Sequence, residues 1–137
     1  MDTISRERRS RNMAAIRSSD TSIELQIRKA LFSQGFRFTK NVRNLPGAPD
    51  IVFSKKKVVI FLDGCFWHGH TGCVDCHIPK TNSTFWETKI KQNIKRDLKN
   101  RSKLRELGFV VLAYWECEVR RINQEILDEI KHVLLRA

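Results

Sequence analysis

Three side chains that bind zinc well lie close together in the sequence, and a fourth follows on a distant segment. Cys65, His70 and Cys73 flank the run Phe66-Trp67-His68, and Cys117 comes far downstream. Zinc prefers thiolate and imidazole ligands, and a site whose four positions are all filled by protein stabilises a fold, because no position is left for water or substrate. The chain must therefore fold so that these two segments meet.

The chain has four cysteines, and the pattern gives no clear place to Cys76. Cys73 and Cys76 have Cys-x-x-Cys spacing, so we expect one of them to lie outside the metal site. We favour Cys73 as the ligand because its turn follows His70 closely, which leaves Cys76 as a free thiol or a substitute ligand. Disulfides in a secreted chain are the alternative. The residues after Met1 are polar and basic and form no apolar signal segment, which favours the reducing cytoplasm.

Size and charge narrow the class of protein. The 137 residues suffice for one domain with a single core, and no apolar run approaches the roughly 20 residues of a membrane span. The formal net charge of +11 favours a polyanion such as nucleic acid as partner. Two basic groups predict a clamp around a phosphate backbone. They are Arg6, Arg8, Arg9, Arg11 and Arg17, and Lys89, Lys91, Lys95, Arg96, Lys99, Arg101, Lys103 and Arg105.

The hydrophobic pattern predicts an α/β fold. Residues 1–19 are expected to form a basic arm that becomes ordered on its partner, and residues 20–137 a single domain. The order of elements predicts a mixed sheet flanked by helices, with the fourth strand beside the third, which would bring Cys117 to the zinc loop. The predicted elements are a helix at 21–35 with a Thr21–Glu24 capping box, strands at 36–39, 50–53 and 58–62, a helix at 84–107, a strand at 109–115 and a helix at 123–135.

Two polar residues have positions suited to phosphodiester hydrolysis. Asp50 stands where a turn enters a strand, and its carboxylate suits magnesium, although a single aspartate after a proline is more often a turn or capping residue. His68 lies between Cys65 and His70, so zinc binding would fix its backbone while its ring stays free to act as a general base. A histidine that faces solvent or supports the zinc ligands is an equally good interpretation.

The helix predicted at 84–107 carries a polar stripe that a core does not need. Trp86, Lys89, Asn93 and Asp97 fall on one face, at about 100° per residue. These side chains can stack on bases, donate to base edges or phosphate, and orient a histidine. An ordinary solvated face is the alternative, but it does not require a tryptophan. Phe66 and Trp67 are either core residues or wedges between base pairs. The apolar stripe beside the polar one consists of Ile90, Ile94 and Leu98.

Taken together, these residues resemble the very short patch repair (Vsr) endonucleases. The runs Gly-Cys-Phe-Trp-His and Trp-Glu-Cys are the most specific part of the resemblance, which extends in order through most of the chain. It implies a restriction-endonuclease-like core with a structural zinc. It also implies a magnesium-dependent enzyme that nicks the thymine strand 5′ of a T:G mismatch, the product of 5-methylcytosine deamination. The matching stretches are Arg11-Asn12-Met13, Ile16-Arg17, Thr21 to Glu24, Leu45-Pro46-Gly47, Pro49-Asp50, Asp63 to Cys73, Phe85-Trp86, Asn93, Arg96-Asp97, Val111 and Trp115-Glu116-Cys117.

The resemblance also implies roles for single residues. Asp50 would bind magnesium together with the main-chain carbonyl of Leu62, and Glu24 would bind water held by the metal. His68 would be the general base, and Asp97 would orient it. The implied DNA contacts are Phe66, Trp67 and Trp86 as a wedge, Met13 on the minor-groove side, and Lys89 and Asn93 at the mispaired bases. The implied zinc ligands are Cys65, His70, Cys73 and Cys117.

Two positions depart from the family pattern. Some members have a hydroxyl residue and a second histidine where this chain has Leu62 and Asp63, so Asp63 is either an additional acidic ligand or a spectator. Cys76 has no role that the resemblance supplies. Two other classes stay open: a zinc-stabilised DNA-binding module without catalysis, and a restriction enzyme that cuts both strands of matched DNA.

The expected partner is double-stranded DNA with a T:G mismatch, and mismatch-repair proteins are further candidate partners. We expect a monomeric bacterial protein of the cytoplasm that associates with the nucleoid and has no contact with a membrane. The sequence leaves open which bases flank the mismatch.

Overall fold

The computed structural model describes residues 22–65, 68, 70 and 80–137. The predicted arm, Thr21 of the capping box, and the residues Phe66, Trp67, Cys73 and Cys76 lie outside the described residues. The helices are α2 (Ser22–Ser33), α3 (Ser83–Glu106), α4 (Glu116–Arg121) and α5 (Asn123–Arg136). The strands are β1 (Thr39–Lys40), β2 (Ile51–Phe53), β3 (Val58–Asp63) and β4 (Val110–Trp115). Among these helices none is both long and apolar enough to cross a membrane.

The four strands form one mixed sheet in the order β1-β2-β3-β4. The pairs β1/β2 and β2/β3 are antiparallel, and β3/β4 is parallel. The parallel register places Val58 opposite Val110 and Asp63 opposite Trp115. Both strands therefore end at the same edge of the sheet, and the segments that follow them start side by side. This confirms the predicted mixed sheet and the predicted pairing of the third and fourth strands.

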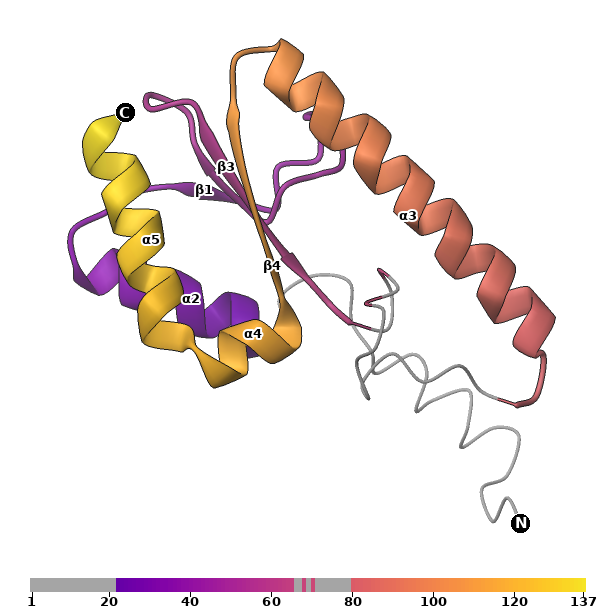
Figure 1. The fold of residues 1–137 in the computed structure, drawn as a ribbon. Helices are drawn as coiled ribbons and strands as arrows, with labels where there is room; N and C mark the ends of the chain where they lie inside the picture. Colours follow the sequence, from indigo (N-terminus) through magenta and orange to yellow (C-terminus); the bar gives the residue numbers. More distant parts are fainter. Residues whose placement is uncertain (1–21, 66–67, 69, 71–79) are drawn as a thin grey trace.

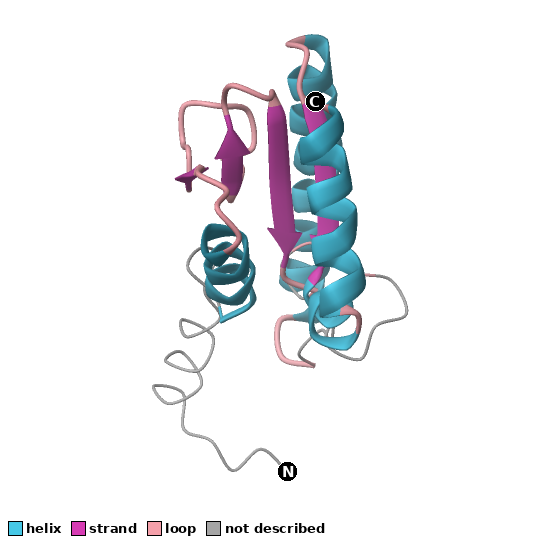
Figure 2. Ribbon diagram, turned by 90° about the vertical axis from the view of Figure 1, so that its left-hand side faces the viewer, coloured by secondary structure: helices cyan, strands magenta, loops and turns pink. Residues whose placement is uncertain are grey.

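Helices cover both faces of the sheet (Figure 1). Helices α2, α4 and α5 lie on one face, and α3 crosses the other face diagonally. Every residue of β2 and β3 is buried, as expected for strands that are covered on both sides. The side view in Figure 2 shows the same arrangement. One core contains Ile23, Ile27, Leu31, Ile51, Phe53, Val58, Ile60, Leu62, Tyr114, Val119, Ile126, Leu127, Ile130 and Leu134. The other contains Val52, Val59, Phe61 and Leu104.

The strand predicted at 36–39 is shorter than its pattern suggested. Only Thr39 and Lys40 pair with β2. The rings of Phe36 and Phe38 contact the ring of Phe53 edge to face, with centroids 6.5 and 5.8 Å apart. The aromatic alternation therefore arises from packing of side chains on the core, and most of the segment forms no sheet hydrogen bonds of its own.

Two further differences concern helices. Helix α4, which starts directly after β4 and carries Cys117, was not predicted, because six residues give too short a pattern. On α3 the apolar stripe is buried only at Ile90, whereas Ile94 is 37% and Leu98 is 67% exposed. The apolar stripe is thus covered near the start of the helix at Ile90, and its later residues face solvent.

Candidate active site and metal centre

Asp50 lies at one end of the sheet, where the chain enters β2. Its backbone N–H donates to the carbonyl of Ile60, and its Oδ2 accepts from the N–H of Leu62 at 2.7 Å. The turn before it is fixed by Gly47, which has φ +77. A Cβ at Gly47 would lie 3.1 Å from Cβ of Asn100 on α3, so the turn packs too closely for a larger residue. The carboxylate of Asp50 thus has a fixed position beside the main chain of Leu62.

The pKa of the Asp50 carboxyl is raised from 3.8 to about 8, chiefly by burial. The charges of Glu24 and Asp63 contribute to this rise, while the Leu62 N–H and His68 oppose it. Glu24 comes from the first turn of α2, and it and Asp63 are only 1% and 3% exposed. Because burial and these neighbouring charges disfavour ionisation of Asp50, a bound cation would stabilise its ionised form. Oxygen ligands of this kind suit magnesium.

Asp63 is held by an arginine from α3. Nη2 of Arg101 lies 2.7 Å from both Oδ1 and Oδ2 of Asp63. The guanidinium also lies over the ring of Phe61, with Cζ 4.5 Å from the ring centroid. The sequence placed Arg101 in the basic group expected to clamp a phosphate backbone, and its pairing with Asp63 was not predicted. Its position four residues after Asp97, on the same face of the helix, is the signal that would have revealed it.

His68 is oriented by a carboxylate. Its Nδ1 lies 2.5 Å from Oδ2 of Asp97 and 3.8 Å from Oδ1 of Asp63. Burial lowers the pKa of the imidazole, but the hydrogen bond with Asp97 and the charges of Asp63 and Asp97 outweigh burial, so the pKa is raised overall. A proton on Nδ1 that faces Asp97 leaves the lone pair on Nε2, and the side chain is 26% exposed. With its proton on Nδ1, the neutral ring would be the tautomer that a general base needs.

Asp97→Asn tests this arrangement. We expect cleavage of DNA to slow about tenfold to a hundredfold with little change in DNA affinity, because the asparagine amide can also donate to Nδ1 and favour the wrong tautomer. Loss of the carboxylate also lowers the pKa of His68, so the acid limb of the pH–rate profile should shift to lower pH. Rates measured against pH with enzyme in excess check both effects. A fully active variant would show that Asp97 does not orient the base.

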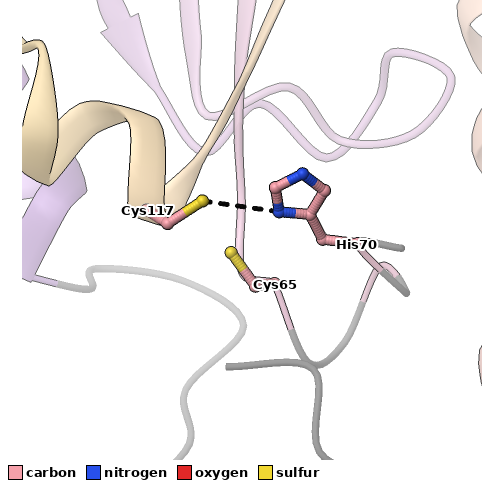
Figure 3. A group of neighbouring side chains, drawn as sticks. All are labelled: Cys65, His70 and Cys117. Carbon is pink, nitrogen blue, oxygen red and sulfur yellow. Dashed lines mark hydrogen bonds between the residues drawn. The ribbon is translucent and has the colours of Figure 1, made fainter. Parts of the chain in front are cut away.

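Three of the four predicted zinc ligands meet at the end of β3 and the start of α4. The ligand atoms of Cys65, His70 and Cys117 all lie within 4.8 Å of one another, and Figure 3 shows the three side chains turned toward a common point. Nδ1 of His70 lies 3.4 Å from Sγ of Cys117. Two ligands of a tetrahedral zinc with usual Zn–S and Zn–N bond lengths are about 3.5 Å apart, so the donor set fits zinc.

The surroundings hold the three candidate metal ligands in place. Cys65 is 1% exposed, and its carbonyl accepts from the N–H of His70 at 3.0 Å. The imidazole of His70 stacks on the indole of Trp115, with centroids 4.3 Å apart and planes at 6°. The parallel pairing of β3 and β4 brings these residues together. Cys73, the fourth predicted ligand, lies outside the described residues.

The predicted DNA contacts have different environments. Trp86 lies in the first turn of α3 and contacts the ring of Phe85 edge to face at 5.1 Å. Phe85 is 60% exposed and was not singled out from the sequence. Lys89 is exposed, as a base-contacting residue requires, whereas Asn93 is 5% exposed and packs into the protein. The remaining three predicted contacts, Met13, Phe66 and Trp67, lie outside the described residues.

Comparisons with known proteins identify the family of this chain. Residues 1–77 match the model of the DNA mismatch endonuclease Vsr family. The type II nicking enzyme V.NmeAIP of Neisseria meningitidis serogroup A is 46% identical over 135 residues, which cover 98% of this chain and 94% of that protein. The DNA mismatch endonuclease Vsr of Escherichia coli K12 is 43% identical over 124 residues, covering 88% and 79%. The chain belongs to the Vsr family.

Membership of the Vsr family confirms the resemblance found in the sequence. The matched residues 1–77 contain Glu24, Asp50 and His68 and two of the residues at the metal centre. A third relative, the type II nicking enzyme V.XorIIP of Xanthomonas oryzae, is 42% identical over 118 residues and covers 86% of each chain. The relatives thus include a mismatch endonuclease and nicking enzymes, and these names bear on the choice of substrate.

Proposed function

We propose that this Vsr-family protein is a magnesium-dependent DNA endonuclease that nicks the thymine strand 5′ of a T:G mismatch. The observation that carries the proposal is the convergence of Asp50 with His68 and Asp97 at one end of the sheet. Asp50 supplies a buried carboxylate for a cation, and His68 supplies a base with an oriented ring. A non-catalytic DNA-binding module would need neither.

The residues divide the hydrolysis between them. Asp50 and the main-chain carbonyl of Leu62 would hold magnesium, with Glu24 as the further acidic group nearby. Magnesium, when bound, supplies positive charge that stabilises the charge developing on the phosphate. His68 takes a proton from water at Nε2, while Asp97 holds Nδ1–H and stabilises the imidazolium that forms. The oxygen of that water attacks phosphorus, and one P–O ester bond breaks.

We propose that zinc fixes the loop that carries His68. Cys65, His70 and Cys117 would be joined by Cys73, and a site with four protein ligands stabilises the fold and takes no part in the reaction. Because His68 lies between two of these ligands in the sequence, zinc would determine where its ring sits. The same arrangement fits a restriction-endonuclease-like core, in which the chemistry stands at the end of a mixed sheet.

We propose the same DNA contacts that the sequence suggested, with one added condition for Asn93. Residues 1–19 would form the arm that carries Met13 to the minor groove, and residues 20–137 the endonuclease domain. Phe66, Trp67 and Trp86 would form the wedge, with Lys89 at the mispaired bases. Since Asn93 is buried, its part in reading bases would require α3 to adjust on binding. We further propose a monomer that acts in the bacterial cytoplasm on nucleoid DNA.

A second candidate is nicking of a matched recognition sequence. The relatives named type II nicking enzymes favour it. One competition experiment separates the two: wild-type protein with magnesium is given equal amounts of T:G, T:A and C:G duplexes with identical flanks. Preferential nicking of the T:G duplex supports the mismatch enzyme. Equal cleavage of the matched duplexes would support sequence-specific nicking.

A further inference from the structure

Two carboxylates compete for the same atom of the proposed base. Nδ1 of His68 lies 2.5 Å from Asp97 and 3.8 Å from Asp63. A neutral imidazole carries one proton on Nδ1 and donates one strong hydrogen bond there, so the orientation of the ring depends on which carboxylate receives it. The side chain of Asp63 is 4% exposed and that of Asp97 is 16% exposed. Asp63 is therefore the more deeply buried of the two carboxylates, yet Asp97 is the one that holds the ring.

The ion pair between Arg101 and Asp63 explains why His68 bonds to Asp97 and not to Asp63. Its Nη2 donates to both oxygens of Asp63 at 2.7 Å, and its side chain is 16% exposed. The guanidinium rests on the ring of Phe61, which limits its movement. Arg101 lies one helical turn after Asp97, so α3 presents to the loop both the carboxylate that holds His68 and the cation that holds Asp63.

We propose that Arg101 is a positioning residue for the nicking reaction: its ion pair with Asp63 keeps that carboxylate away from His68, so that Asp97 alone orients the base. The proposal rests on the function proposed above. Without Arg101, the buried carboxylate of Asp63 would lose its ion pair, and Nδ1 of His68, 3.8 Å away, would be a donor within reach. The ring would then turn away from Asp97, and Nε2 would no longer be oriented to take a proton from the attacking water.

Paired substitutions test the proposal. Arg101→Met removes the charge and keeps an apolar stem over Phe61, and we expect kcat for nicking to fall about tenfold to a hundredfold while KM changes less than about threefold. Asp63→Asn alone leaves Arg101 without its ion-pair partner, so its kcat and melting temperature are measured as the reference for the double variant. Adding Asp63→Asn to Arg101→Met should restore kcat to within about threefold of the wild type, because the competing charge is gone. The kcat of Arg101→Lys should lie between that of the wild type and that of Arg101→Met.

Each alternative role of these residues predicts a different result. If Arg101 binds DNA, KM rises and the double variant is not rescued. If Asp63 is a magnesium ligand, Asp63→Asn abolishes nicking. If the pair only stabilises the fold, the melting temperature falls and kcat per folded molecule does not. Each of these outcomes overturns the proposal. Lys131→Met is the control, because Lys131 forms an ion pair with Asp128 at 3.8 Å on α5, which covers the face of the sheet opposite α3.

A second readout separates this proposal from the proposed function. The hydrogen-bonded Nδ1–H of His68 can be followed by heteronuclear NMR of the imidazole, assigned with the His68→Gln variant. We expect its signals to change in Arg101→Met and to return in the double variant, whether or not any duplex is cut. Unchanged signals in a folded Arg101→Met protein would overturn the role of Arg101. A wild-type protein that cuts no duplex would instead overturn the proposed function.

Discussion

Asp50→Asn is expected to raise the melting temperature of the magnesium-free protein at alkaline pH and to abolish its nicking activity. The native state holds Asp50 with a pKa raised from 3.8 to about 8, chiefly by burial and by the charge of Glu24. Between these two values the native state binds more protons than the unfolded state, so the stability falls as pH rises through this window. Asparagine keeps an oxygen that accepts from Leu62 and carries no charge.

The sign and size of the stability effect follow from that shift. Below pH 3.8 both states are protonated and the substitution should gain nothing. Above a pH of about 8 the full gain should be present, on the order of a few kcal/mol, because one pKa unit corresponds to about 1.4 kcal/mol and coupling with Glu24 reduces the sum. Thermal unfolding measured against pH without added magnesium checks this. Asp128→Asn, an exposed site on α5, is the control.

Magnesium should reduce the difference in melting temperature between the variant and the wild type. A cation stabilises the ionised Asp50 of the wild type and has less to bind in the variant, so added magnesium should narrow the difference in melting temperature. The same loss of a ligand should reduce nicking by at least about a thousandfold, since the metal supplies several kcal/mol of stabilisation of the transition state. If the variant is no more stable than the wild type at alkaline pH, then the negative charge of Asp50 is better compensated in the wild type than its surroundings indicate.

Cys117→Ser is expected to remove the bound zinc and to destabilise the protein by several kcal/mol. Cys117 joins α4 to the loop after β3 through the cluster with Cys65 and His70, so the loss of one thiolate releases two segments that are far apart in the sequence. Binding energy at a structural zinc site contributes directly to folding. Zinc content of the purified protein and its melting curve, measured with equal zinc in the buffer, are the two readouts.

Two further cysteine variants complete that experiment. Cys73→Ser should behave like Cys117→Ser, and Cys76→Ser like the wild type, if Cys73 is the fourth ligand. The reverse pattern would assign the position to Cys76. A Cys117→Ser protein that contains one zinc per chain and melts like the wild type would contradict the proposed zinc centre.

Much of the site could be predicted because it depends on periodicity and ligand chemistry. The order of the elements predicted that the third and fourth strands pair, and this pairing brings Cys117 to Cys65. The helical spacing that put Asp97 on a polar stripe was likewise sufficient to suggest that it orients His68. In these cases a regular element transmits a local pattern over a long distance.

Other features depend on tertiary contacts that leave no such pattern. The pairing of Arg101 with Asp63 is invisible in a helix rich in lysine and arginine until the position of the sheet is known. Burial of Asn93 and exposure of Leu98 depend on how α3 packs against the rest of the protein, which no residue of the helix specifies by itself. The alternating phenylalanines at 36 and 38 satisfied the strand pattern for another reason, the packing of their rings on Phe53.

The most direct test of the central claim is a strand-resolved nicking assay of wild type and Asp50→Ala. Each strand of a duplex with one T:G pair is labelled at its end, and the products formed with magnesium are measured at single-nucleotide resolution in several flanking sequences. The account predicts one cut, on the thymine strand 5′ of the mismatch, that is absent with Asp50→Ala. A cut that persists in the variant, or tight binding in every sequence context without any cut, would contradict it.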